Sequence, residues 1–227
     1  METKRYSVLI IDDHPLIIDS YKTALKIYSH QKESIAFSIQ TAEDCDSGIK
    51  LINEFAKNEE KLSIVFLDVK LPPSRKGKIL SGEDLGIRIN NLLQGTKIIV
   101  CTTFNDNYRV HSILKSLNPD GFLIKNDITP KELVQSIDTV LNDPPYYSKS
   151  VIKLLRLQVV NNYSFDNIDR KILYELSIGT RMKDLPDIIP LSIAGIEKRK
   201  RHLKQIFNIN SPNDKELLKI AKEKGFV

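Results

Sequence analysis

Several features that mark particular protein classes are scarce in this 227-residue sequence, which has two cysteines, no tryptophan and no long apolar run. Cys45 and Cys101 are too few for a disulfide framework and lack the spacing of a metal-binding motif, so we interpret both as core residues. No apolar stretch reaches the length that crosses a bilayer, and the opening METKRYSVLI does not have the pattern of a secretory signal. The sequence therefore predicts a protein of the reducing cytoplasm with no membrane partner.

Charge is divided unevenly along the chain. Residues 1–143 contain 18 Lys and Arg against 20 Asp and Glu, a net charge of −2, whereas residues 144–227 contain 16 against 9, a net charge of +7. A slightly acidic part followed by a strongly basic part predicts two domains with different partners, the second of which binds a polyanion.

Residues 1–143 alternate between strand-like and helix-like segments. Five short apolar runs are typical of strands: Val8–Ile11, Ile35–Gln40, Ser63–Leu67, Lys97–Cys101 and Gly121–Ile124. Five segments have helical spacing: Pro15–Tyr28, Asp44–Lys57, Gly82–Leu93, Asn107–Leu117 and Pro130–Leu141. The last helix has a capping signal, with Thr129 before Pro130 and Glu132 at the third helical position. This alternation predicts an α/β fold with a five-stranded, doubly wound parallel sheet.

The pattern changes after residue 143. Pro144 and Pro145 end the α/β pattern, Val151–Gln158 has the pattern of a connecting helix, and Val159–Asn167 is interpreted as linker. Beyond it the chain has only helical patterns. The predicted organisation is one domain over residues 1–143, a linker over 144–165 and a small all-α domain over 166–227.

Polar residues stand at the carboxyl ends of the predicted strands, the edge at which open parallel sheets bind ligands. They are Asp12, Asp13, Asp68, Thr102 and Lys125. Clustered carboxylates repel one another unless a cation holds them, and Mg²⁺ binds a few carboxylates while keeping positions for a phosphate. A carboxylate can attack phosphorus, and Lys125 and Thr102 offer positive charge and a hydrogen-bond donor to the phosphoryl oxygens. The sequence therefore predicts a Mg²⁺-dependent phosphoryl-transfer pocket.

The segments IIDDHPL, FLDVKLP, VCTT and GFLIK, in this order, resemble the receiver domain of two-component response regulators over residues 6–143. The resemblance implies a flavodoxin-like fold and a sensor histidine kinase that phosphorylates Asp68. The other roles that it implies are Mg²⁺ binding by Asp12, Asp13, Asp68 and the backbone carbonyl of Lys70, phosphoryl contacts by Thr102 and Lys125, and a switch formed by Thr102 and Phe122. The DDHPL segment is similar to the subfamily that carries a LuxR-type helix-turn-helix.

Two departures from the family pattern lie near the predicted pocket. A basic insertion runs from Ser74 to Ser81. We interpret it as a surface excursion, because loop extension costs little, with a gate or a kinase contact as the alternative. Thr103 stands where the family prefers Ala or Gly, which predicts slower entry to the pocket. His14 is interpreted as a helix-start residue beside Pro15 rather than as a metal ligand.

The basic C-terminal part contains an amphipathic helix pattern, SIAGIEKRKRHLKQIF, over residues 192–207. Ser192 is a good N-cap, and Ile193, Ile196, Leu203 and Phe207 fall on one face of the helix. The opposite face is cationic, and a helix, a break and a second short helix precede it. This order is typical of a helix-turn-helix that binds double-stranded DNA.

Residues 166–227 resemble the LuxR-type (NarL/FixJ-like) DNA-binding domain, notably in DRKILYELSIG, PLSIAGIEKRKRHLK and KELLKIAKEKGFV. The resemblance implies four helices, the third of which enters the major groove. The contacts implied by position are Glu197, Lys198 and Arg201 at base edges and Arg199, Lys200 and Lys204 at phosphates or between helices. Gly195 and Arg199 depart from the family pattern, and Pro186 predicts a shortened or kinked scaffold helix.

The sequence thus predicts a DNA-binding transcription regulator that dimerises when phosphorylated and has no enzymatic activity beyond self-phosphorylation and self-dephosphorylation. One alternative is an orphan regulator that binds DNA without phosphorylation. Another is a Mg²⁺-dependent phosphohydrolase, which is less favoured because Val69 and Lys70 follow Asp68, where such enzymes place a second acid two residues on. A third is that the basic domain recruits a protein.

Overall fold

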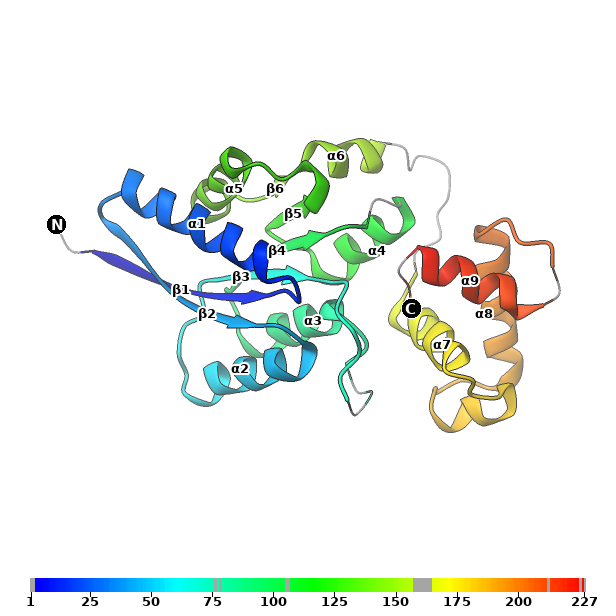
Figure 1. The fold of residues 1–227 in the computed structure, drawn as a ribbon. Coiled ribbons are helices and arrows are strands. Elements are labelled where there is room, and N and C mark those ends of the chain that lie inside the picture. Colours follow the sequence, from blue (N-terminus) through cyan, green and yellow to red (C-terminus); the bar gives the residue numbers. More distant parts are fainter. Residues whose placement is uncertain are drawn as a thin grey trace.

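The structure, a computed structural model, describes residues 3–75, 77, 79–104, 107–156, 165–211, 213–224 and 226. An α/β part, blue to green in Figure 1, precedes a helical part, yellow to red. Among the described residues, no helix combines the length and the apolar character needed to cross a membrane.

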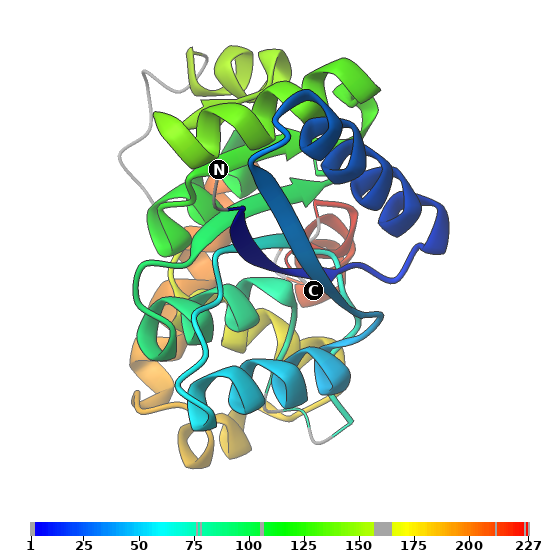
Figure 2. The ribbon, with the colours of Figure 1, turned by 90° about the vertical axis from the view of Figure 1, so that its left-hand side faces the viewer.

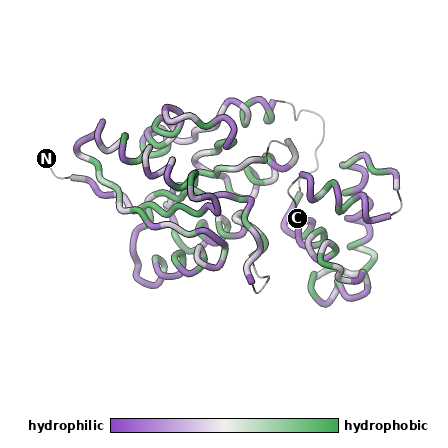
Figure 3. Tube along the Cα trace, viewed as in Figure 1, coloured by the Kyte–Doolittle hydropathy of each residue, from purple (hydrophilic) through white to green (hydrophobic). Residues whose placement is uncertain are grey.

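A parallel sheet forms the centre of the α/β part, and Figure 2 shows it from the end at which β1 and β2 begin. Its order is β2-β1-β3-β4-β5-β6. The strands are β1 (Lys4–Ile11), β2 (Ile35–Ala42), β3 (Ile64–Asp68), β4 (Lys97–Thr102), β5 (Gly121–Ile124) and β6 (Tyr146–Tyr147). Every residue of β3 and β5 is buried, as expected for strands that are covered on both faces, and the centre of the sheet is mostly hydrophobic (green in Figure 3). The predicted α/β fold with a parallel sheet is confirmed.

The predicted number of strands is too low by one. The sixth strand, β6, pairs with β5, so that Gly121 lies opposite Tyr146 and Phe122 opposite Tyr147. It is two residues long and directly follows Pro145, so it lacks the alternating run by which a strand is detected in sequence. The paired prolines end the preceding helix as predicted, but the chain then returns to the edge of the sheet.

Helices cover both faces of the sheet. They are α1 (Pro15–Gln31), α2 (Cys45–Lys57), α3 (Gly82–Leu92), α4 (Asn107–Leu117), α5 (Pro130–Asn142) and α6 (Lys149–Arg156), with a 3-10 turn, η1 (Lys125–Asp127). Val8 and Ile10 of β1 face α1 and α5, whereas Leu9 and Ile11 face α2, α3 and α4. Val151 of α6 joins the second of these cores. The doubly wound arrangement is therefore confirmed.

Two helix starts carry the caps that the sequence predicts. At the start of α5, Thr129 Oγ1 accepts the backbone N–H of Glu132 at 3.2 Å, and Glu132 Oε2 accepts that of Thr129 at 3.1 Å. Ser192 Oγ accepts the N–H of Gly195 at 3.2 Å. These bonds satisfy donors that the first turn of a helix leaves without partners.

The helical part contains α7 (Asn167–Ser177), η2 (Met182–Asp187), α8 (Ile193–Ile206) and α9 (Asp214–Glu223). Pro186 lies inside η2, a short 3-10 helix, in agreement with the predicted shortening. Ile193, which the sequence places on one face of α8 with Ile196, Leu203 and Phe207, is 46% exposed. Packing begins one turn later, where Ile196 joins a cluster from α7 and η2.

The predicted connecting helix corresponds to α6, which packs on the sheet and whose described residues end at Arg156. Residues 157–164, which include Gln158 and most of the predicted linker from Val159, lie outside the described residues.

Gly82, the first residue of α3, lies against the backbone of Asp68. A Cβ atom at Gly82 would be 1.9 Å from the carbonyl oxygen of Asp68, closer than two such atoms can approach. We expect Gly82→Ala to lower the free energy of unfolding by about 1–3 kcal/mol or more, because two backbone segments would have to separate. Urea denaturation followed by circular dichroism measures this change.

Gly195→Ala is the matched control, since a Cβ there would meet its nearest neighbour, Ser192 Oγ, at an ordinary 3.5 Å. Its stability is expected to stay the same or to rise by up to about 1 kcal/mol, because alanine favours the helix more than glycine does. Equal stabilities of the two variants would contradict the close contact at Gly82.

Candidate functional site

Three carboxylates and an imidazole gather at the carboxyl ends of β1 and β3. The ligand atoms of Asp12, Asp13, His14 and Asp68 all lie within 4.8 Å of one another. Asp12 and Asp68 are buried, whereas Asp13 and His14 are exposed. The structure thus brings the three predicted acids together in a pocket that opens to solvent past Asp13 and His14.

The register of the sheet explains this gathering. Asp12 and Asp68 directly follow residues that lie opposite each other in β1 and β3. Thr102 ends β4, and Lys125 directly follows the β5 residue that lies opposite Thr102. Because the four strands are parallel and in register, side chains that are far apart in sequence reach the same edge.

Lys125 joins the two buried carboxylates. Its Nζ lies 2.7 Å from Asp12 Oδ2 and donates to Asp68 Oδ2 at 2.6 Å. The contact between Nζ and Asp12 Oδ2 is an ion pair between an ammonium and a buried carboxylate. The other oxygen of Asp68 accepts the backbone N–H of Lys70 at 2.7 Å. These contacts fix the orientation of the Asp68 carboxylate.

Burial and charge act in opposite directions on the titration of this pair. Burial raises the pKa of Asp68, and the neighbouring Lys125 lowers it without cancelling the rise. Burial lowers the pKa of Lys125, but attraction to Asp68 and Asp12 outweighs burial, so this pKa is raised. Lys125 is therefore protonated at neutral pH. A single ammonium stands against several carboxylates, which leaves negative charge for a further cation to balance.

The two predicted switch residues lie on neighbouring strands. Thr102 is fully buried, and its Oγ1 accepts the backbone N–H of Phe104 at 3.2 Å. Phe122 is also fully buried, in the core beneath α2, α3 and α4. Thr102 lies opposite Ile124 of β5, and Phe122 is two residues before Ile124. Since side chains alternate along a strand, Thr102 and Phe122 are on the same face of the sheet. Thr103 is exposed beside them.

His14 has contacts that the sequence reasoning missed. It directly precedes α1, as predicted, but its Nδ1 also lies 2.6 Å from Asp13 Oδ1 and 3.3 Å from Asp12 Oδ1. The position of His14 directly after Asp12 and Asp13 in the sequence could have indicated these contacts. The imidazole belongs to the mouth of the acidic pocket.

The predicted DNA-contacting residues of α8 fall into two groups. Glu197, Lys198 and Arg201 are exposed. The other three form ion pairs within the helical part: Arg199 with Asp166 at 2.8 Å and Asp169 at 2.9 Å, and Lys200 and Lys204 with Asp214 at 2.5 and 2.9 Å. The second group therefore contributes to the packing of α8 against α7 and α9.

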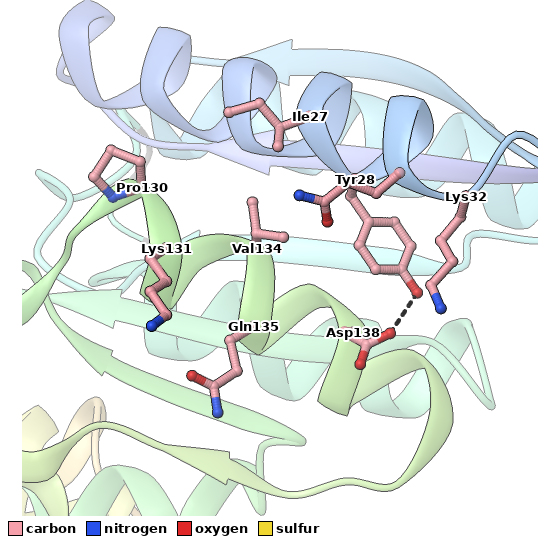
Figure 4. Close-up of a pocket in the computed structure, with 9 residues that line it drawn as sticks. Ile27, Tyr28, Lys32, Pro130, Lys131, Val134, Gln135 and Asp138 are labelled. Carbon is pink, nitrogen blue, oxygen red and sulfur yellow. Dashed lines mark hydrogen bonds between the residues drawn. The ribbon is translucent and has the colours of Figure 1, made fainter.

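A separate cavity of about 560 Å³ lies between α1 and α5 (Figure 4). Tyr28 and Asp138 line it and share a hydrogen bond of 2.8 Å. Burial, and then the neighbouring Asp138, raise the pKa of Tyr28 to about 12. The cavity contains none of the clustered acids, so we assign the chemistry to the acidic pocket.

Comparison with known families identifies the α/β part. The family model of the response regulator receiver domain matches residues 8–138. This chain belongs to the response regulator receiver family. The match includes the whole receiver pocket from Asp12 to Lys125 and ends within α5.

The receiver and the helical part together are also similar to known regulators. The chain is 23% identical over 228 residues to the transcriptional regulatory protein MctR of Rhizobium johnstonii, covering 100% of this chain and 97% of that protein. Among solved structures, the RcsB response regulator of Salmonella typhimurium matches with a TM-score of 0.64, 21% identity and 99% of each chain covered.

RcsB of Salmonella enterica serovar Typhimurium, solved bound to promoter rprA in the presence of the phosphomimetic BeF3−, matches with a TM-score of 0.65 and 20% identity, covering 95% of this chain and 98% of that one. These likenesses show that a receiver followed by a helical part is a shared fold.

Replacing Lys125 tests the charge balance of the pocket. We expect Lys125→Met to lower the free energy of unfolding by roughly 3–5 kcal/mol, because the buried carboxylates of Asp12 and Asp68 lose their compensating charge. Asp68→Asn should cost less, since it removes a negative charge, and the double variant should recover part of the loss. Urea denaturation at neutral pH with a chelator present compares them. A Lys125→Met variant as stable as the wild type would refute this account.

Proposed function

We propose that this chain is a two-component response regulator that binds DNA and is switched by phosphorylation of Asp68. The observation that carries the proposal is the ammonium of Lys125, held between the buried carboxylates of Asp12 and Asp68 in a receiver fold. The phosphoryl group would come from a sensor histidine kinase. Because a sensor histidine kinase would be its partner, we expect the protein to be located in the cytoplasm.

The domains follow the same division. We place the receiver at residues 1–143, the linker at 144–165 and the DNA-binding domain at 166–227. The first residues of the linker, which form β6 and α6, pack on the receiver and would move with it.

The acidic pocket fits Mg²⁺. Hard cations prefer carboxylate and carbonyl oxygens, and the carboxylates of Asp12, Asp13 and Asp68 converge here. Asp12 Oδ2 is buried and faces the ammonium of Lys125 at 2.7 Å, and a carboxylate oxygen in such a pair keeps a lone pair for a metal ion. With the backbone carbonyl of Lys70, these groups would hold the ion. When bound, Mg²⁺ would neutralise charge on the phosphoryl oxygens.

The chemistry of the chain itself is a single displacement. A carboxylate oxygen of Asp68 attacks the phosphorus of the kinase phosphohistidine. The new P–O bond forms as the P–N bond breaks, and the imidazole leaves with the electron pair. Lys125, which already contacts Asp68, then turns to a phosphoryl oxygen, and the hydroxyl of Thr102 donates to another.

The switch would begin at Thr102. Its movement toward the new negative charge leaves space in the core beneath it, on the face where Phe122 lies. Because Phe122 is fully buried, its contribution would be a change of packing rather than of exposure. The phosphorylated form would favour a homodimer.

Double-stranded DNA is the partner that the helical part fits best. Lys198 and Arg201, with Glu197, form an exposed, mainly cationic face on α8 that suits base edges in a major groove. Arg199, Lys200 and Lys204 would orient this helix and reach phosphates from its sides. The similarity to MctR, a transcriptional regulatory protein, and to RcsB solved on a promoter supports this assignment.

Phosphate uptake tests the receiver site. With acetyl phosphate and Mg²⁺, the wild type is expected to take up one phosphoryl group, which intact-mass spectrometry detects, and Asp68→Asn none. The control Asp19→Asn alters a 73% exposed aspartate on α1 and should leave uptake unchanged. Uptake by Asp68→Asn equal to that of the wild type would exclude Asp68 as the acceptor. Turnover of a generic phosphomonoester would revive the phosphohydrolase alternative.

DNA affinity tests the role of α8. We expect Lys198→Ala and Arg201→Ala each to weaken operator binding by about 1–3 kcal/mol, the value of a good base contact. Lys219→Ala, which removes a 75% exposed charge from α9, is the matched control and should have little effect. Selection on genomic fragments supplies the operator, and fluorescence anisotropy at several salt concentrations measures binding. Equal losses in all three variants, or affinity independent of salt, would contradict the proposed interface.

A further inference from the structure

A second cluster of buried charges lies between the receiver and the helical part. Glu83, in the first turn of α3, forms ion pairs with Arg109 of α4 and, at 3.3 Å, with Arg170 of α7. Its other oxygen accepts the hydroxyl of Ser116 at 2.6 Å. The side chains of Glu83, Arg109 and Arg170 are only 1–3% exposed. Glu83 is thus the common partner of one arginine from each part.

Arg170 makes further contacts with the start of α3. Its Nη1 donates to Asp84 Oδ1 at 3.2 Å, and its Nη2 donates to Ser81 Oγ at 2.7 Å. Ser81 also caps α3 by accepting the N–H of Glu83 at 3.2 Å. The guanidinium from α7 therefore inserts into the first turn of α3, where two acids and a hydroxyl surround it.

Neighbouring contacts at this junction are also polar or involve charge. Ser112 Oγ of α4 donates to the carbonyl of Phe165 at 3.4 Å, and the guanidinium of Arg109 lies 5.5 Å from the ring centroid of Phe226. Water can solvate such groups when the surfaces separate, so a junction of this kind opens more readily than an apolar core.

The cluster is tied to the acceptor residue through α3. Gly82, between Ser81 and Glu83, is packed so closely on Asp68 that a Cβ would lie 1.9 Å from the Asp68 carbonyl oxygen. The backbone of Asp68 is therefore in direct contact with the first turn of α3.

A second connection runs through the strand that carries the switch threonine. Thr102 Oγ1 accepts the backbone N–H of Phe104, and the ring centroid of Phe104 lies 5.3 Å from the guanidinium of Arg109. Arg109 pairs in turn with Glu83, the partner of Arg170. Direct contacts therefore lead without a break from the pocket to the helical part.

We propose that Glu83, Arg109 and Arg170 form a clasp that holds the helical part on the receiver, and that phosphorylation opens it through Phe104. The idea rests on the proposed phosphorylation of Asp68. When the hydroxyl of Thr102 turns to a phosphoryl oxygen, it gives up the N–H of Phe104. The ring then shifts under Arg109, and the two arginines no longer share Glu83 in one fixed geometry.

The clasp controls orientation rather than access. Lys198 and Arg201 are exposed while it is closed, and α8 lies on the side of the helical part away from the receiver (Figure 1). A closed clasp holds α8 in one direction relative to the receiver. Two chains on a two-fold DNA site need the direction that the spacing of the half-sites dictates. Opening the clasp supplies that freedom.

The distance between the two parts tests the clasp in the full chain. Spin labels at Lys50→Cys and Lys219→Cys, both at exposed positions, report this distance by pulsed electron paramagnetic resonance. The two native cysteines are buried, and burial raises the pKa of each thiol to about 12, so they resist labelling. The unphosphorylated protein is expected to give a narrow distribution.

Arg170→Ala should give a broad distribution without any phosphodonor, because Glu83 then keeps only its partner within the receiver. The matched control is Arg181→Ala, which removes an exposed arginine that pairs with Asp184 on the same part, and it should stay narrow. Circular dichroism checks that both variants are folded. A narrow distribution for folded Arg170→Ala would overturn the clasp.

Phosphorylation tests the opening. With acetyl phosphate and Mg²⁺, the distance distribution of the wild type should become as broad as that of Arg170→Ala. The ratio of open to closed forms should rise roughly 5- to 150-fold, the usual range of allosteric coupling. Phe104→Leu should take up the same phosphate and stay narrow.

A wild type that is phosphorylated at Asp68 and stays narrow would overturn the opening, and a Phe104→Leu protein that opens like the wild type would overturn the relay. Absence of phosphate on Asp68 would count against the proposed function instead, and the Arg170→Ala comparison would still decide whether the clasp exists.

Discussion

One ammonium shared between two buried carboxylates is the constraint on which the receiver pocket depends. Lys125 reaches Asp12 and Asp68 because β1, β3 and β5 end at the same edge of the sheet. Removing three charges from water is costly unless they compensate one another. The compensation is incomplete, because the acids outnumber the ammonium. The pocket is therefore suited to a divalent cation and, after it, to a phosphate.

The junction between the receiver and the helical part uses the same physics with the charges reversed. There, one glutamate stands between two arginines, and a nearby aspartate and serine complete the set. Burying these groups contributes little net stability, but it fixes their geometry, since a misplaced charge has no compensation. In the proposed switch, this contact favours one arrangement of the two parts until phosphorylation changes its geometry.

Intramolecular ion pairs also narrow the surface that α8 offers. Arg199, Lys200 and Lys204 contribute to the strong positive charge of the C-terminal part, yet each is paired with an aspartate of α7 or α9. The net charge of the C-terminal part therefore overstates the number of basic side chains that α8 offers to a ligand. The exposed residues Lys198 and Arg201 form a smaller face, which suits a single groove.

The sequence by itself determined the order of strands and helices, the caps of α5 and α8, and the residues that end each strand, because these depend on local periodicity and on neighbours along the chain. It also carried enough of the receiver pattern to bring Asp12, Asp68 and Lys125 to one edge, since parallel strands in register leave little choice. Only the tertiary structure decided the short strand β6, the exposure of Ile193 and the contact of His14 with Asp13. It alone decided the pairing of Glu83 with Arg170, because ion pairs between segments far apart in sequence depend on how the parts pack, and no local pattern encodes that packing.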